Sequence, residues 1–302
     1  MPENGAPTPN RSKGLFMSEN MQHLLYSVLD PTLLDLADQG IRTLLPNPDG
    51  APSVTLEMPA NAINYIICYV PRSGSTHLTS LLQNSGLAGR PADFFNVYYG
   101  QLPVEAQQVF ERTGVYCVAG ASKHYGCASV EDYLQTVAGA TRSANGVFGL
   151  KMDLAQATIL LRRGLFWNPR WNWKYIYLTR RDLLMQGISH FLALESGQWS
   201  SLSVDGRPVA YDENEIVTEM LNLCDMMKRW EAVLGLLGID PLRITYEDLE
   251  ADTEGTMLRC LQHLGVASGR GQLPICSRYR KQRTADAEEW ARHIRSKARN
   301  HQ

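Results

Sequence analysis

A continuous run of apolar and β-branched residues, Ile63–Val70, is followed at once by a short polar stretch. The run has the length and composition of a strand that is buried on both faces in a parallel sheet. Beyond the polar stretch, apolar residues recur at helical spacing, at Leu78, Leu81 and Leu82, until Gly86 ends the segment. The pattern predicts a strand, a short loop and a helix, in that order.

Apolar runs and amphipathic segments continue to alternate along the rest of the chain. Short apolar runs predict further strands at residues 147–150, 175–179 and 242–249. Helical periodicity predicts helices at residues 131–141, just after Lys151, from Asp182 onward, at 213–237 and at 252–264, with a basic loop and a last helix within 278–299. Strands separated by helices make a central parallel sheet flanked by helices, so the predicted fold class is α/β. Such sheets bind their ligands at the carboxyl ends of the strands.

The beginning of the chain has a different pattern. Residues 1–16 are rich in Pro, Asn and Gly and predict a disordered tail. Residues 17–60 are predicted to be a helical N-terminal extension, because leucines at helical spacing within 18–45 indicate two short amphipathic helices with a break at Pro31. One domain is then predicted over residues 61–302. Two roles stay open for residues 18–45: packing on that domain, or docking a partner or a second subunit.

Composition narrows the class of protein. The 302 residues, 44% of them hydrophobic, are enough for the core of one α/β domain. A formal net charge of −2 gives no overall attraction to nucleic acid or to a membrane, so an anion must bind at a local cluster. The N-terminus has no apolar signal-peptide core and no stretch approaches the roughly 20 apolar residues of a membrane span, which predicts a cytoplasmic protein. The six cysteines are scattered without metal-ligand spacing, so we expect reduced, buried thiols and no metal site.

The polar stretch after the first strand has the composition of an anion site. It contains Arg72, Ser73, Gly74, Ser75 and Thr76. Loop amides and the N-terminus of the next helix point the same way, while the arginine and the hydroxyls add charge and hydrogen bonds. A nucleotide-triphosphate P-loop would need a lysine before Ser75 and another glycine at its start, and the chain has neither. The planar guanidinium of Arg72 suits a tetrahedral phosphate or sulfate instead.

A second basic cluster follows the strand predicted at residues 175–179. Arg180 and Arg181 lie where this strand ends, and Ser189 comes two helical turns later. One ligand that carries two separate phosphate groups would fit two such corners at one edge of a sheet. The alternative is that both arginines are ordinary helix-start residues paired with Asp182.

Six segments, in their order along the chain, resemble the bacterial trehalose 2-sulfotransferase family. They are VPRSGSTHL, GRPADFF, GVFGLKMDLAQ, YLTRRDLLMQGISHF, ITYEDL and KQRTADAEEWARH. The resemblance extends from about Asn64 to Arg295 and leaves out the N-terminal extension. It implies a P-loop-like sulfotransferase fold, with 3′-phosphoadenosine 5′-phosphosulfate (PAPS) as donor and 3′-phosphoadenosine 5′-phosphate (PAP) as product. The resembled family includes dimers, so a homodimer is a further expectation.

The resemblance also implies how the donor is bound. The loop residues Arg72–Thr76 would hold the 5′-phosphosulfate, and either Arg180 or Arg181 would hold the 3′-phosphate together with Ser189. Basic C-terminal loops of sulfotransferases close over the nucleotide, a role that would fall here to Arg280 and Lys281, which lie in a cluster with Arg278 and Arg283. The alternative for this cluster is a solvated basic face.

The resemblance further implies a catalytic base. The segment GRPADFF places Asp93 where the family has a carboxylate that takes a proton from the sugar hydroxyl. The family pattern has Glu at this position, and Asp is one methylene shorter. Lys151, at the end of the next strand, would reach the same edge and touch the sulfuryl group or the acceptor; the alternative is a surface lysine. This chemistry needs no metal.

The function that fits these features is PAPS-dependent transfer of a sulfuryl group to a hydroxyl of a carbohydrate or a glycosylated small molecule. The alternatives are a non-catalytic nucleotide-binding module that docks through residues 18–45, and, less favoured, a small-molecule kinase. The aromatic run 166–175 would stack on a sugar or on adenine, or belong to the core. Spacing gives no partner, and so no role, to His77, His124 or His190.

Overall fold

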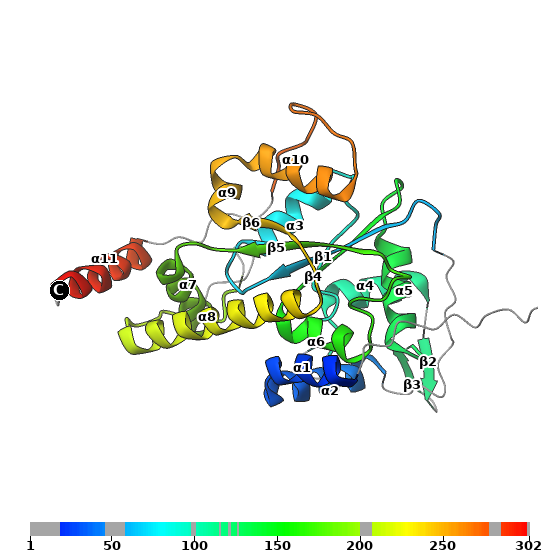
Figure 1. The fold of residues 1–302 in the computed structure, drawn as a ribbon, viewed down its shortest axis with the longest axis horizontal. Coiled ribbons are helices and arrows are strands. Elements are labelled where there is room, and N and C mark those ends of the chain that lie inside the picture. Colours follow the sequence, from blue (N-terminus) through cyan, green and yellow to red (C-terminus); the bar gives the residue numbers. More distant parts are fainter. Residues whose placement is uncertain are drawn as a thin grey trace, which may run out of the picture.

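In a computed structural model of the chain, residues 19–45, 58–97, 101–114, 116–119, 122–125, 127–199, 207–277 and 285–300 are described (Figure 1). The strands are β1 (Ile63–Tyr69), β2 (Tyr116–Ala119), β3 (Ser122–Tyr125), β4 (Val147–Met152), β5 (Trp173–Thr179) and β6 (Leu242–Thr245). The helices are α1 (Glu19–Val28), α2 (Pro31–Leu44), α3 (Ser75–Asn84), α4 (Val104–Thr113), α5 (Val130–Thr141), α6 (Leu154–Arg162), α7 (Leu183–Ser196), α8 (Glu213–Leu236), α9 (Tyr246–Ala251), α10 (Thr253–Leu264) and α11 (Ala285–Asn300).

The main sheet has four strands in the order β4-β1-β5-β6, and every neighbouring pair is parallel. Parallel strands need crossover connections, which the helices between them supply. The predicted α/β fold with a central parallel sheet is therefore confirmed. Since all four strands run the same way, their carboxyl ends meet at one edge of the sheet.

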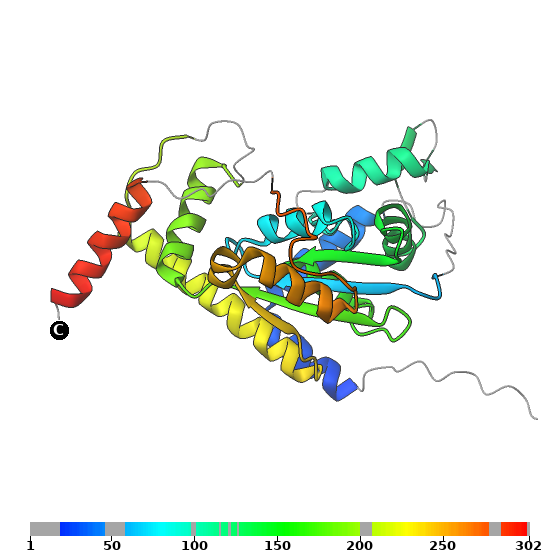
Figure 2. The ribbon, with the colours of Figure 1, turned by 90° about the horizontal axis from the view of Figure 1, so that it is seen from above.

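Side chains of β1 alternate between two cores, as expected for a strand covered on both faces. Ile66 and Cys68 belong to a core shared with α1, α2, α4, α5, α6 and α8, whereas Tyr65 and Ile67 belong to a core shared with α3, α9 and α10. In Figure 1, α9 and α10 accordingly lie above the sheet, and α1, α2, α6 and α8 lie below it. Figure 2 shows α7, α11 and the beginning of α8 beyond one end of the strands, where they form a third, smaller core.

The two N-terminal helices pack on the domain. Leu25 of α1, Leu29 directly after α1 and Leu44 of α2 are almost fully buried in the larger core. Gly40 lets α2 approach α6 closely, because a Cβ atom there would lie 2.7 Å from Cδ1 of Ile159. These contacts support the first of the two roles left open for residues 18–45, which is packing on the domain. Partner docking stays a prediction.

Substitution of Leu29 should therefore destabilise the whole domain. We expect Leu29→Ala to lower the free energy of unfolding by about 2–4 kcal/mol, because Leu29 is only 1% exposed and its removal leaves a cavity. Leu24→Ala, in the helix α1 that directly precedes Leu29 but 49% exposed, is the matched control and should change stability by less than about 0.5 kcal/mol. Urea unfolding followed by circular dichroism measures both. Equal effects would mean that α1 does not contribute to the domain core.

Three predictions of local structure are corrected. The strand predicted at 242–249 ends at Thr245, where a capping box between Thr245 and Asp248 starts helix α9. The sequence pattern did not predict α4, nor the antiparallel hairpin of β2 and β3. Strand β4 continues through Met152, so Lys151 lies inside the strand, not at its end.

The aromatic run 166–175 is part of the core. Trp171 and Trp173 are buried and stacked with ring centroids 5.2 Å apart, and Phe166 packs against Trp230. The alternative of a stacking surface for a ligand is therefore wrong for these residues.

The side chains of five cysteines are described, those of Cys68, Cys127, Cys224, Cys260 and Cys276, and all five are free thiols. Cys68, Cys127 and Cys260 are buried as expected, but Cys276 is exposed. No helix among the described residues is long and apolar enough to cross a membrane.

Candidate active site

The carboxyl edge of the sheet collects most of the polar residues that the sequence singles out. The loop from Pro71 to Gly74 follows β1, Lys151 lies near the end of β4, and Arg180 follows β5. Tyr246 and Glu247, at the start of α9, follow β6. Four segments far apart in the sequence thus supply side chains to one edge.

The loop between β1 and α3 has an unusual backbone. Arg72 has φ of 63° and Gly74 has φ of 85°, both in the left-handed region. Gly74 is required for a second reason, because a Cβ atom there would lie 2.6 Å from Cδ2 of Tyr246. The hydroxyl of Ser73 is buried and has no hydrogen-bond partner among the described residues. A buried, unsatisfied hydroxyl in a tight loop is typical of a site that binds a polar ligand.

The side chain of Arg72 joins the two predicted anion corners. Its Nε donates to Oγ of Ser189 on α7 at 2.9 Å, and its Nη1 donates to the carbonyl oxygen of Trp199 at 2.6 Å. Helix α7 also braces the loop, since Nε2 of Gln186 donates to the carbonyl oxygen of Pro71 at 2.7 Å. The loop after β1 and the helix after β5 therefore form one continuous site.

The site carries concentrated positive charge. Burial, with a smaller contribution from the charge of Arg180, lowers the pKa of Arg72 to about 10. Burial likewise lowers the pKa of Arg180. Both groups are still cations at neutral pH, and a bound anion would stabilise them.

The two consecutive arginines have different surroundings. Arg180 is half-buried: its guanidinium lies 4.8 Å from the ring centroid of Tyr246, and its Nη1 lies 3.5 Å from the carbonyl oxygen of Arg72. Its Nε is buried and has no hydrogen-bond partner among the described residues. The side chain of Arg181 is 62% exposed and pairs with Glu247 and Asp248 of α9. The alternative, in which both arginines pair with Asp182, does not describe Arg181, because Asp182 forms its ion pair with Arg295 of α11.

Asp93 lies beside Lys151 because of a backbone contact. Ala92 forms an isolated parallel bridge with Leu150, and the amide of Lys151 donates to the carbonyl oxygen of Ala92 at 3.1 Å. The segment GRPADFF thus runs along β4 and brings Oδ2 of Asp93 to 2.5 Å from Nζ of Lys151. The hydroxyl of Tyr69 donates to Oδ1 of the same carboxylate at 3.0 Å.

Lys151 connects this carboxylate to the anion loop. It is only 5% exposed, which excludes the alternative of a surface lysine. Its Nζ also donates to Oγ1 of Thr76 at 3.2 Å and lies 5.1 Å from the ring centroid of Tyr69. Asp93, Lys151 and the loop therefore belong to one polar cluster.

Most predicted site residues that the structure describes meet at this edge, while Arg181 is turned toward α9. Arg280 and Lys281, with Arg278 and Arg283, lie outside the described residues. Sequence reasoning did not single out Tyr69, Trp199, Tyr246 or Glu247. Tyr246 and Glu247 had one available signal, the ITYEDL segment, which was noted only as part of the resemblance.

One histidine has a partner that spacing did not indicate. Nδ1 of His190 on α7 lies 2.7 Å from Oε2 of Glu219 on α8, and its ring contacts Trp199 edge-on with centroids 5.8 Å apart. Burial lowers the pKa of His190 below its ordinary value, despite the opposing effect of Glu219. The expectation that His190 lacks a carboxylate partner is therefore wrong.

Comparison with known proteins identifies the family. The family model described as Stf0 sulphotransferase matches residues 64–297, more than three quarters of the chain. The chain belongs to the Stf0 sulphotransferase family. The resemblance noted in the sequence is thereby confirmed, and this family member is an enzyme that transfers a sulfuryl group.

Two curated relatives are similar over most of the sulfotransferase chain. Trehalose 2-sulfotransferase of Mycobacterium tuberculosis is 24% identical over 259 residues, which cover 78% of this chain and 95% of the relative. Trehalose 2-sulfotransferase of Mycolicibacterium smegmatis is 25% identical over 265 residues, with the same coverages. Among solved structures, a sulfotransferase domain from the curacin biosynthetic pathway matches with a TM-score of 0.50 and 18% identity, over 75% of this chain and 81% of that one. This likeness supports the sulfotransferase fold.

Proposed function

We propose that this sulfotransferase uses PAPS as donor and a carbohydrate hydroxyl as acceptor. The observation that carries the proposal is the position of Lys151, whose Nζ contacts both Asp93, at 2.5 Å, and Thr76 of the anion loop, at 3.2 Å. A candidate base and a candidate donor site thus share one buried cation. The names of the two mycobacterial relatives support a sugar as the acceptor class.

The residues present fit a donor with two phosphate groups. The hydroxyl of Ser73 and the Nε of Arg180 are buried donors without a hydrogen-bond partner among the described residues, and both residues adjoin Arg72. We assign the 5′-phosphosulfate to Arg72, Ser73 and the loop amides, with Gly74, Ser75 and Thr76. We assign the 3′-phosphate to Arg180 and Ser189 in preference to Arg181, whose guanidinium is held by α9.

PAPS supplies a sulfuryl group attached to a phosphate leaving group. Asp93 would accept the proton of the acceptor hydroxyl, and the hydrogen bond from Tyr69 with the ion pair to Lys151 fixes the direction of its carboxylate. Arg72 and Lys151 would stabilise negative charge on the departing phosphate, because Lys151 is a buried cation and the half-buried Arg72 is fixed by Ser189 and Trp199. All these groups are ordered by contacts within the protein before any ligand binds.

The test is transfer of radiolabelled sulfate from PAPS to a panel of sugars that includes trehalose. We expect a labelled sugar that depends on both PAPS and the acceptor, and no phosphorylated sugar when ATP replaces PAPS. Calorimetric binding of PAP without transfer to any sugar would favour the non-catalytic module. Phosphorylation from ATP would favour the kinase instead.

A further inference from the structure

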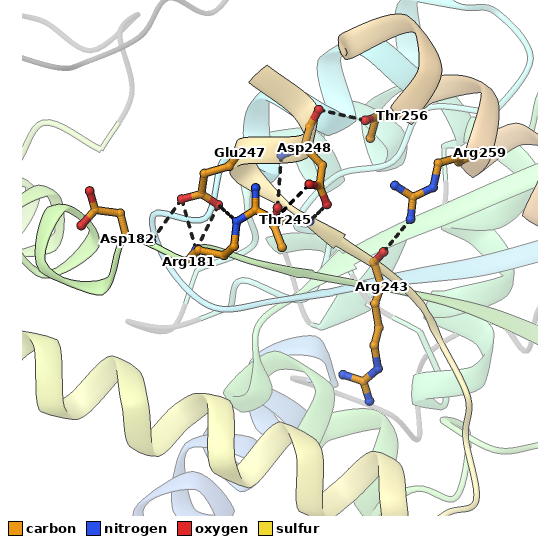
Figure 3. A network of polar contacts seen from close by, with 8 residues as sticks. All are labelled: Arg181, Asp182, Arg243, Thr245, Glu247, Asp248, Thr256 and Arg259. Carbon is orange, nitrogen blue, oxygen red and sulfur yellow. Dashed lines mark hydrogen bonds and ion pairs between the residues drawn. The ribbon is translucent and has the colours of Figure 1, made fainter. Parts of the chain in front are cut away.

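The start of α9 touches the turn between β5 and α7 through one carboxylate. Glu247 accepts hydrogen bonds from the backbone amide of Arg181, at 3.2 Å and 3.0 Å to its two oxygens, and from the backbone amide of Asp182 at 3.1 Å (Figure 3). These amides belong to the residues just after Arg180. Glu247 thus binds the backbone of the turn that carries the half-buried arginine of the site.

The same helix also holds the guanidinium of Arg181 outside the site. Nη1 of Arg181 donates to Oδ1 of Asp248 at 3.2 Å, and its Nε lies 3.8 Å from Oε2 of Glu247. Figure 3 shows the guanidinium of Arg181 turned toward these two carboxylates. The guanidinium of Arg180, the residue before Arg181, lies instead 4.8 Å from the ring centroid of Tyr246.

Glu247 is itself held rigidly. The capping box fixes the first turn of α9, since Thr245 accepts from the amide of Asp248 and the carboxylate of Asp248 accepts from the amide of Thr245. Thr256 of α10 adds a hydrogen bond to the carbonyl oxygen of Asp248 at 3.1 Å. A carboxylate on a fixed helix start can hold the position of a neighbouring turn, which a freely moving side chain would not do.

We propose that Glu247 is a positioning residue for recognition of the nucleotide 3′-phosphate. It holds the β5–α7 turn so that Arg180 faces the donor loop, and with Asp248 it holds Arg181 away. Glu247 itself does not contact the nucleotide. This inference rests on the proposed function, because the 3′-phosphate of PAPS is the group that Arg180 would bind.

The test compares two nucleotides that differ only in the 3′-phosphate. Affinities of the full-length chain for PAP and for adenosine 5′-phosphate are measured by titration calorimetry. We expect Glu247→Ala to weaken PAP binding about 10-fold, because hydrogen bonds to a charged acceptor are the stronger kind, and to change adenosine 5′-phosphate binding by less than about 2-fold. Glu247→Gln keeps an acceptor oxygen without the charge and should recover part of the loss, to roughly 3-fold.

Glu231 of α8 offers a matched control, a carboxylate that is also paired with an arginine. It forms a two-bond ion pair with Arg243 of β6, at 2.6 Å and 2.9 Å, but does not touch the β5–α7 turn. Glu231→Ala should leave the ratio of the two affinities unchanged. If Glu247→Ala fails to fold, Glu247→Gln carries the test, since its smaller change leaves the packing intact.

The possible outcomes separate the two proposals. If the unmodified protein binds PAP no better than adenosine 5′-phosphate, the proposed donor is wrong. If it prefers PAP and the Glu247 variants keep that preference, or lose affinity for both nucleotides equally, the positioning role is wrong. If the Glu247 variants lose affinity for PAP alone and Glu231→Ala does not, the result supports the positioning role.

Discussion

Asp93→Asn is expected to reduce the rate of sulfuryl transfer about 1000-fold, the range over which removal of a general base acts. The carboxylate is the group we assign to accept the acceptor proton, and asparagine keeps its shape without its basicity. Affinity for PAP should change by less than about 2-fold, because Asp93 contacts Tyr69 and Lys151 and not the arginines of the donor site. Radiolabelled transfer and calorimetry measure the two quantities separately.

Asp93→Glu is the matched variant for this experiment. It restores the carboxylate with the longer side chain of the family pattern, so we expect it to retain transfer within about 10-fold of the unmodified protein. Full activity in Asp93→Asn would remove Asp93 from the mechanism. Because the substitution also leaves Lys151 without a buried counter-charge, thermal unfolding should accompany the kinetics to exclude loss of the folded state.

Arg72→Ala is expected to weaken binding of both PAP and adenosine 5′-phosphate about 100-fold, as truncation of a half-buried, charged binding group generally does. Arg72 connects the loop to Ser189, and its pKa of about 10 keeps it charged at neutral pH. A loss of affinity for both nucleotides distinguishes this variant from the Glu247 variants, which should lose affinity for PAP alone. The measurement is calorimetry at neutral pH.

Two variants control for charge and geometry in that experiment. Arg170→Ala removes a cation from an exposed pair with Glu131, so nucleotide affinity should stay within about 2-fold. Arg72→Lys keeps the charge but not the planar fork and should lie between the two extremes. Equal binding by Arg72→Ala and Arg170→Ala would show that the anion site is elsewhere.

Local features of the fold were predictable from the sequence. The run Ile63–Val70 predicts a strand by itself, because a strand that is buried on both faces is continuously apolar. The turn after it is likewise local, because its left-handed backbone favours glycine at position 74. Helix α10 was likewise predicted, since Asp252 caps it and Gly265 ends it. The strand predicted at 242–249 was half wrong, because the capping box of TYED stops an apolar run that otherwise suits a strand.

The relations within the site depend on contacts that sequence spacing does not reveal. The ion pair of Asp93 with Lys151 follows from the single bridge of Ala92 to Leu150. The different surroundings of Arg180 and Arg181 depend on Glu247, 66 residues from Arg181. His190 and Glu219 are 29 residues apart on two packed helices, so no periodicity within one helix connects them.

The packing of α1 and α2 has a practical consequence for anyone who wishes to produce the enzyme. The family match begins at residue 64, yet Leu25, Leu29 and Leu44 lie in the same core as β1 and β4. A chain trimmed to the matched region would present that apolar surface to water and aggregate. The segment that the family model matches is, in this protein, shorter than the segment that shares one core.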